Sequence, residues 1–422
     1  MSDPSFSRAR LRAVTRQIDA VEDLLEYASP HEPTVWSRRG DMLVGIGSAL
    51  AFTGRLRPEG TELTRWWHEV TAAAEIDDPV RVPGTGLVAF GALPFDPESA
   101  AMASFTVPAV ILGRRDGRSW VTRIQQVDGA ETPAALPTPT PYGPHWSATV
   151  GPGTLTPDGY QDAVRAGLDE IRAGAVSKVV LARDLAGTVP AGSDLRRLVR
   201  ALAAAYPDTW TFAVDGLIGA SPETLVTVSG GTVTARVLAG TVARGADADA
   251  DTAASVALAT SAKDLDEHQY AVQSVLAALR PHTSALVSEE QPFMLKLPNV
   301  WHLATDVEGA LDAGASALDL LGALHPTAAV AGTPTQTAIE LIRRLEPFDR
   351  ARYAGPVGWI DAHGDGEWAI ALRCAQFDLE TGRNGRIPFT AHAGAGIVAG
   401  SDPEAEMLET RVKFRPIIDA LA

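Results

Sequence analysis

The chain has 422 residues, of which 45% are hydrophobic and 21% are charged, and it contains one cysteine, Cys374. These proportions are typical of a globular protein with a large core, and one cysteine excludes an internal disulfide framework and a thiolate zinc site. The formal net charge of −16 disfavours nucleic acid and acidic lipid as partners, so an anionic substrate must be held by local cations or a metal.

The first residues carry charges where a signal peptide has an apolar core. No apolar run reaches the roughly 18 residues that a membrane-spanning helix needs. We therefore expect a cytoplasmic protein without membrane association.

Residues 1–150 contain few candidate catalytic groups. Glycine alternates with apolar residues in 41–52 and 85–95, which is typical of strands and close-packed turns, and 60–75 has helical periodicity. A proline- and threonine-rich passage at 132–144 predicts a linker or a long surface loop.

From about residue 155 the pattern changes to long, regular elements. Helical periodicity predicts helices at 156–175, 261–280, 335–348 and 403–414. Apolar runs bounded by turn residues predict strands at 177–185, 210–219, 223–229 and 232–240, and a hairpin over 353–379 whose turn contains Asp365-Gly366. Because strands and helices follow no regular βαβ rhythm, an α+β fold is favoured over a doubly wound sheet.

Two of the predicted helices carry pairs of carboxylates three residues apart. Asp264 and Glu267 form one pair and Glu406 and Glu409 the other, with Lys413 four residues beyond Glu409 on the same face. Together the pairs could form an all-oxygen site for a hard cation such as Mg²⁺. The solvated faces of two acidic surface helices would show the same spacing, so the spacing leaves both interpretations open.

Three other features are candidates for chemistry. Lys178 begins a strongly apolar strand, where loss of hydration favours the neutral amine that a general base requires, although a lysine at a strand end could also reach solvent. Glu223 follows a Ser-Pro turn, which suits either an acid with a raised pKa or ordinary turn chemistry. Gly394 and Gly396 precede the last helix, at an expected strand-to-helix turn, where backbone N–H groups could approach an anion or the chain could simply pack closely.

Nine segments occur in the order seen in chorismate-binding enzymes, a family that includes isochorismate, salicylate, anthranilate and aminodeoxychorismate synthases. The segments are SKVVLARDL, GASPETLV, VLAGTVARG, KDLDEHQYAV, VWHLATDVEGAL, LHPTAAVAGTP, RARYAGPVGWID, WAIALRCA and AGAGIVAGSDPEAEMLETRVKF. The resemblance covers about residues 155–422. It implies an α+β fold, a single large unit of two packed, mainly antiparallel sheets flanked by helices with the site in a cleft between them. Residues 1–150 would be the variable N-terminal half and 151–422 the chorismate-binding catalytic region.

The resemblance also implies roles for individual residues. Lys178 resembles the base that deprotonates an attacking water, and Glu223 resembles the acid that protonates the departing hydroxyl. Glu267 and Glu409 match ligands of Mg²⁺, which would hold the ring carboxylate, and Glu406 and Asp264 are close enough in sequence to bind it directly or through water. The matching substrate-binding positions are Gly240, Thr241, His302, Tyr353, Arg373, Gly394, Gly396 and Lys413. Among these, Tyr353, Arg373 and the two glycines resemble the cradle of the enolpyruvyl carboxylate.

Within the family, the chain is most similar to isochorismate synthases. The ammonia-using members lack the lysine that Lys178 resembles, and Ala239 stands where aminodeoxychorismate synthases typically have lysine. We expect a Mg²⁺-dependent isomerase of the hydroxymutase type that converts chorismate reversibly to isochorismate for menaquinone or siderophore biosynthesis. We expect it to act as a monomer without a glutamine amidotransferase subunit. A salicylate synthase, and an inactive paralogue that serves as a binding scaffold, remain the alternatives.

Overall fold

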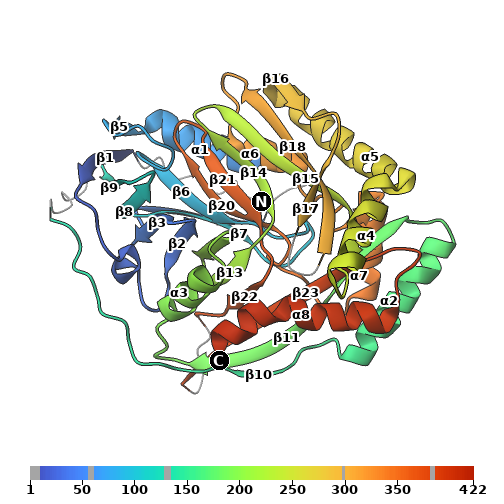
Figure 1. The fold of residues 1–422 in the computed structure, drawn as a ribbon. Helices are drawn as coiled ribbons and strands as arrows, with labels where there is room; N and C mark the ends of the chain where they lie inside the picture. The colour runs from blue at the N-terminus through green and yellow to red at the C-terminus, as the bar shows by residue number, and fades with distance from the viewer. Residues whose placement is uncertain (1–9, 56–60, 128–134, 297–299, 381–384) are drawn as a thin grey trace, which may run out of the picture.

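The computed structural model describes residues 10–55, 61–127, 135–296, 300–380 and 385–422. Two large, mainly antiparallel sheets form its centre and helices cover their outer faces (Figure 1). This arrangement confirms the α+β fold predicted from the sequence. Both halves of the chain contribute strands to both sheets.

The larger sheet has 13 strands in the order β10-β11-β23-β22-β13-β12-β2-β3-β8-β9-β1-β5, and β19 pairs with β11 beside this path. Only the β1–β5 pair is parallel among its described strand pairs. The strands are β1 (Leu11–Ile18), β2 (Thr34–Arg38), β3 (Asp41–Ile46), β5 (Glu75–Asp77), β8 (Val110–Arg115), β9 (Arg118–Gln126), β10 (Thr149–Pro152), β11 (Lys178–Pro190), β12 (Trp210–Val214), β13 (Leu217–Ser221), β19 (Gly332–Thr333), β22 (Cys374–Phe377) and β23 (Arg386–Ile397).

The second sheet has 10 strands in the order β16-β18-β15-β14-β21-β20-β6-β7-β4, and β17 pairs with β18. Its strands are β4 (Leu50–Gly54), β6 (Val88–Ala92), β7 (Ala103–Val107), β14 (Thr224–Ser229), β15 (Thr232–Ala243), β16 (Thr283–Ser288), β17 (Phe293–Lys296), β18 (Val300–Leu311), β20 (Pro356–Asp361) and β21 (Gly366–Ile370).

The helices lie outside the sheets. They are α1 (Thr61–Ala73), α2 (Pro157–Arg172), α3 (Arg196–Ala205), α4 (Ala248–Thr260), α5 (Ala262–Leu279), α6 (Ala317–Leu324), α7 (Thr335–Leu345) and α8 (Pro403–Leu421), with short 3₁₀ turns at Leu24–Tyr27 and Arg280–His282. Helices α2 and α8 lie against β11 and β23, and α4 and α5 lie against β15 and β18 (Figure 1). None of the helices in the described part of the chain is long and apolar enough to cross a membrane.

Local capping fixes where the helices next to the site begin. The side chain of Asp402 accepts a hydrogen bond from the Ala405 N–H at 2.9 Å, and Pro403 occupies the first turn of α8, where its missing N–H costs nothing. Ser261 caps α5 in the same way through Asp264 N. The helices predicted at 60–75, 156–175, 261–280, 335–348 and 403–414 are confirmed as α1, α2, α5, α7 and α8, whereas α3, α4 and α6 were not predicted.

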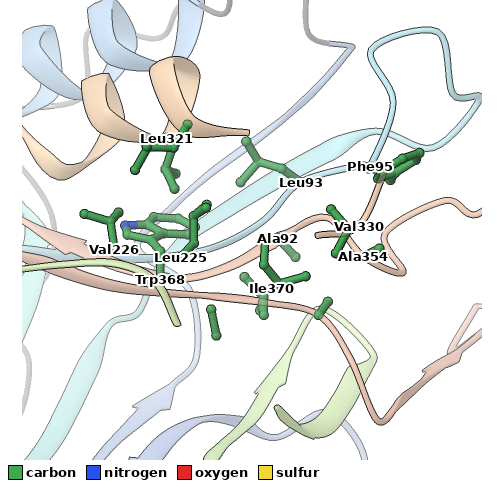
Figure 2. Packing of buried hydrophobic residues seen from close by; sticks show 14 of the residues in the cluster. Ala92, Leu93, Phe95, Leu225, Val226, Leu321, Val330, Ala354, Trp368 and Ile370 are labelled. Atoms are coloured by element: carbon green, nitrogen blue, oxygen red, sulfur yellow. The ribbon is translucent and has the colours of Figure 1, made fainter. Parts of the chain in front are cut away.

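The core between the sheets is built from large apolar side chains. Trp36 of β2 and Trp359 of β20 lie there, each at most 2% exposed, and both donate their indole N–H to Glu367. Trp368, the next residue along β21, faces the opposite side of the second sheet, where its ring contacts Phe105. Figure 2 shows Leu321 of α6 above Trp368 and Leu225, so this helix covers the outer face of the second sheet. A second apolar cluster lies on the outer face of the larger sheet, under α3 and α8.

One strand prediction was wrong. The stretch 210–219 forms two strands, β12 and β13, which pair with each other. Asp215 and Gly216 between them have φ values of 49° and 74°, as in the tight turns that asparagine-glycine and aspartate-glycine pairs favour. The chain therefore reverses there and brings Ser221 back toward the start of β12.

The predicted loop at 132–144 lies partly outside the described residues. From 135 to 148 the chain has no helix or strand, as expected. It is nevertheless held in place, because the Tyr142 hydroxyl donates to Asp23 at 2.9 Å and the guanidinium of Arg196 lies 5.0 Å from the Tyr142 ring centroid.

Candidate active site

Two of the places where the chain passes from one sheet to the other lie next to each other. The first crossing, from β13 to β14, contains Glu223, and the second, from β21 to β22, contains Arg373. Hydrogen bonds join the crossings: Ile370 N donates to Glu223 O at 3.1 Å, Ala220 N donates to Arg373 O at 3.2 Å and Ser221 Oγ donates to Ile370 O at 2.5 Å. The candidate acid and the candidate substrate cation therefore lie side by side where the sheets meet.

Lys178 comes to this place from the start of β11. A Cβ atom added to Gly396 on the neighbouring strand would lie 2.9 Å from Lys178 Cε, so the lysine side chain runs directly over this glycine. Lys178, Lys413 and Arg373 all act electrostatically on Glu223. Burial nevertheless raises the pKa of the Glu223 carboxyl, and the three cations only partly offset this effect. A protonated carboxyl is the form that donates a proton.

The structure corrects the expected position of the glycines. Gly394 and Gly396 lie inside β23 rather than in a turn before α8, opposite Ala182 and Val180 of β11. The turn itself follows at 398–402. The expected strand-to-helix turn at these glycines was therefore wrong, because β23 continues through both of them.

The backbone groups of the two glycines nevertheless point toward an open edge. The amides of Val180 and Ala182 point away from β23, since they donate to Ala331 O at 2.9 Å and to Glu346 Oε1 at 2.8 Å. In an antiparallel pair of strands, a residue opposite such an amide also points its own N–H and C=O away from the partner strand. The N–H and C=O groups of Gly394 and Gly396 therefore point away from β11. Strand β22 pairs with β23 only as far as Ala391, so the N–H groups of both glycines face the crossings.

Arg373 and Tyr353 lie next to each other in the site. Arg373 has a φ of 51°, a strained value for a residue other than glycine, which is common at functional positions. Its guanidinium makes no hydrogen bond or ion pair with any residue in the described ranges, although Glu223 and Glu409 act on it electrostatically. Tyr353 is 8% exposed and stacks on His392 at 5.1 Å, and burial raises its pKa so that it stays a hydroxyl.

His302 and Gly240 contribute from the second sheet. Gly240 has a φ of 78° at an irregularity in the β15–β18 ladder, a conformation that glycine adopts without strain. Burial lowers the pKa of His302, and Lys178 and Lys413 act in the same direction, so the imidazole is neutral near pH 7. Thr241 lies opposite His302 in the ladder, but its side chain is outside the described residues.

The carboxylates of α8 are arranged around Lys413. Its Nζ lies 2.6 Å from Glu409 Oε1 and donates to Gly394 O at 2.8 Å. Burial raises the pKa of Glu406, and the neighbouring Glu409 raises it further. A divalent cation here would relieve this repulsion, because oxygen ligands of carboxylates are those that Mg²⁺ prefers.

The first turn of α5 faces Gly240. The Cβ of Asp264 lies 3.5 Å from the position that a Cβ on Gly240 would take. The side chain of Glu267, a predicted ligand, is outside the described residues. Within the ranges that the structure covers, no three histidine, cysteine or acidic side chains form a preformed metal cluster.

A buried ion pair behind the site was missed by sequence reasoning. Glu346 and Arg350 form a bond of 2.5 Å with side chains 1% and 3% exposed. Arg350 also donates to Val180 O at 2.7 Å, and Glu346 accepts the Ala182 amide. The pair hydrogen-bonds to the backbone of β11 along a part of its edge where no neighbouring strand does. It thereby holds in place the strand that carries Lys178. The i, i+4 spacing was visible in the sequence, but its burial was not.

Replacing Arg350 with methionine should lower the free energy of unfolding by about 3–5 kcal/mol, because it leaves the Glu346 carboxylate buried without a partner. Urea unfolding with linear extrapolation measures the change. Arg344→Met is the matched control, because Arg344 pairs with Glu170 at the surface, where the side chains are 63% and 32% exposed. This replacement should lower the free energy of unfolding by less than about 1 kcal/mol. Equal losses in the two variants would show that the buried pair has no special role.

A cavity of about 370 Å³ borders Tyr353. His392, Phe348 and Asp184 line it, and Lys178, Glu223 and Arg373 do not. The candidate catalytic groups therefore lie at the crossings rather than in this cavity. At the crossings, a candidate base, a candidate acid and an unpaired guanidinium converge, which suits proton transfer on an anionic substrate.

Comparisons with known proteins agree with this chemistry. The family model described as chorismate binding enzyme matches residues 5–422. The isochorismate synthase MenF of Bacillus subtilis is 30% identical over 407 residues, which are 90% of this chain and 85% of that protein. The isochorismate synthase DhbC of the same species is 42% identical over 277 residues, 63% of this chain and 68% of that protein. The crystal structure of MenF from Escherichia coli has a TM-score of 0.73 at 24% identity, covering 97% of this chain and 95% of that one, and so shows the fold.

Proposed function

The chain belongs to the chorismate-binding enzymes, and from this premise we infer that it is an isochorismate synthase, an isomerase that converts chorismate to isochorismate. Two relatives that cover much of the chain carry this activity in their names. The observation that carries the assignment is the convergence of Lys178, Glu223 and Arg373 at the sheet crossings. We expect the product to serve menaquinone or siderophore biosynthesis, and the enzyme to act in the cytoplasm as a monomer.

We propose that Lys178 and Glu223 carry the two proton transfers. In the reaction, water adds to C2 of the ring while the hydroxyl at C4 leaves and the double bonds shift between them. Lys178 takes the proton of the water, and Glu223 gives its proton to the departing hydroxyl. The raised pKa of Glu223 supports this role, because the residue must hold a proton at neutral pH to act as an acid.

We propose that the cationic groups around the crossings hold the two carboxylates of the substrate. Arg373, Tyr353 and the N–H groups of Gly394 and Gly396 suit the enolpyruvyl carboxylate, since a guanidinium and outward-pointing amides are donors without acceptors among the described residues. Neutral His302, with Gly240 and Thr241, would border the ring. These groups overcome the net charge of −16, which otherwise repels a dianion.

The residues present fit a magnesium ion. Glu406 and Glu409 are neighbours on α8, and the adjacent carboxylate raises the pKa of Glu406, as expected for a set of oxygen ligands awaiting a cation. We propose that Glu267, Glu406 and Glu409 hold Mg²⁺, with Asp264 binding directly or through water. When bound, the ion would neutralise and orient the ring carboxylate of the substrate. Lys413 keeps Glu409 in place at 2.6 Å and would release it to the ion.

Product analysis tests the proposed function. After incubation of the enzyme with chorismate and Mg²⁺, chromatography should show isochorismate in equilibrium with chorismate, with little salicylate, pyruvate or anthranilate. Added ammonium should change nothing, and a chelator should abolish turnover, which excess Mg²⁺ restores. Stoichiometric pyruvate and salicylate would make the chain a salicylate synthase, and absence of any turnover would make it a binding scaffold.

A further inference from the structure

A small cavity lined with arginines lies away from the catalytic residues. Arg38 and Arg39 at the β2–β3 turn and Arg114 and Arg115 at the β8–β9 turn surround it, and Glu367 of β21 closes it from the other sheet. Its volume is about 110 Å³. None of the proposed catalytic, substrate or metal residues lines it. We call it the arginine cavity.

The positive charge in the arginine cavity is only partly compensated. Four arginines and two acidic residues, Asp41 and Glu367, line it, in a chain whose overall charge is −16. A third carboxylate, that of Asp208, does not line the cavity but pairs with Arg39 at 2.8 Å, so four positive charges meet three negative ones. Arg115 is paired with Glu367 at 2.6 Å, with both side chains largely buried. The same carboxylate accepts the indole N–H groups of Trp36 at 2.8 Å and Trp359 at 3.1 Å, so three donors already share Glu367.

Two of the arginines have carbonyl acceptors but no carboxylate within ion-pair distance in the described part of the chain. Arg38 donates to Asp208 O at 3.0 Å, and its guanidinium lies 4.5 Å from the ring centroid of Trp210. Arg114 donates to Gly40 O at 3.0 Å and to Val21 O at 3.4 Å. Burial lowers the pKa of Arg38, and the nearby Arg39 and Arg236 lower it further, while Glu367 and Asp208 offset only part of this effect. An anion in the cavity would relieve this repulsion.

The size and the donors of the cavity restrict what it could hold. Guanidinium groups present paired N–H donors that match the oxygens of carboxylate and phosphate groups. A volume of about 110 Å³ exceeds the space that one water needs but is below the roughly 300–1,000 Å³ of sites for drug-sized ligands. We propose that the arginine cavity binds a small oxyanion, a phosphate or a carboxylate group, at a site separate from the catalytic centre.

Thermal unfolding in the presence of anions tests this proposal. Inorganic phosphate should raise the melting temperature of the full-length protein, and the increase should saturate and exceed that given by sodium chloride at the same ionic strength. Acetate is tested in the same way, as a probe for carboxylate binding. Saturation by either anion supports the site and identifies the preferred oxyanion. No excess over chloride with both anions would overturn the proposal.

Charge-removing variants locate the site. Arg38→Gln should weaken the anion effect about tenfold or more while chorismate turnover stays normal, since Arg38 is outside the catalytic centre. Arg165→Gln is the matched control, because Arg165 forms an exposed pair with Asp162 on α2. If Arg38→Gln does not fold, Arg114→Gln replaces it in the same assay. An anion response in the folded variant equal to that of the control would place the anion elsewhere and overturn the proposal.

Discussion

Replacing Lys178 with alanine is expected to lower turnover of chorismate by about 10²-fold or more, with little change in chorismate affinity. Lys178 reaches the crossings from β11, over Gly396, and acts electrostatically on Glu223 and His302. As the group that takes a proton from water, it stabilises the transition state more than the bound substrate. Steady-state kinetics should therefore show a fall in kcat at nearly constant KM.

Two further variants separate proton transfer from simple attraction. Lys178→Arg keeps a positive charge but cannot accept a proton at neutral pH, because the guanidinium stays protonated. It should be about as inactive as the alanine variant. Lys296→Ala removes an exposed lysine of β17 and should leave turnover unchanged. Substantial isochorismate formation by Lys178→Arg would mean that the residue acts only as a cation.

Replacing Glu223 with glutamine should also lower turnover by about 10²-fold or more, because the amide cannot donate an acidic proton. The pH dependence follows from the raised pKa of Glu223. The acid must be protonated to act, so turnover of the parent enzyme should fall as pH rises through this pKa. A profile without an alkaline limb in kcat/KM would contradict the assignment of Glu223 as the acid.

Glu223→Gln, which should lower turnover, should raise the free energy of unfolding at alkaline pH. A carboxyl whose pKa is raised in the folded state binds its proton more tightly there than in the unfolded chain, so its contribution to stability is present at low pH and is lost as pH rises through the folded pKa. Near pH 5, the Glu223→Gln variant and the parent should therefore unfold at the same urea concentration. Near pH 8, the variant should unfold at a higher urea concentration than the parent. Glu340→Gln, an exposed change on α7, is the control and should show no such pH dependence.

The sequence was sufficient for the local elements and for the family. Periodicity and capping residues are local signals, so helices such as α2 and α5 were predicted to within a few residues, whereas α8 continues to Leu421, beyond its predicted end at 414. The hairpin between β20 and β21 was predicted from its Asp365-Gly366 pair. The same Asp-Gly signal at residues 215–216 was overlooked, and as a result β12 and β13 were taken as one strand.

The tertiary structure decided how the candidate residues meet. Lys178, Glu223 and Arg373 are far apart in the chain, and they meet because β11 and two adjacent crossings between the sheets converge, since sheet pairing joins segments of distant sequence. It also decided that Gly394 and Gly396 are strand residues whose amides face an open edge, since the direction of an amide depends on the partner strand. Burial, which raises the pKa of Glu223 and makes the Glu346–Arg350 pair structural, is likewise a property of the packed chain rather than of any segment.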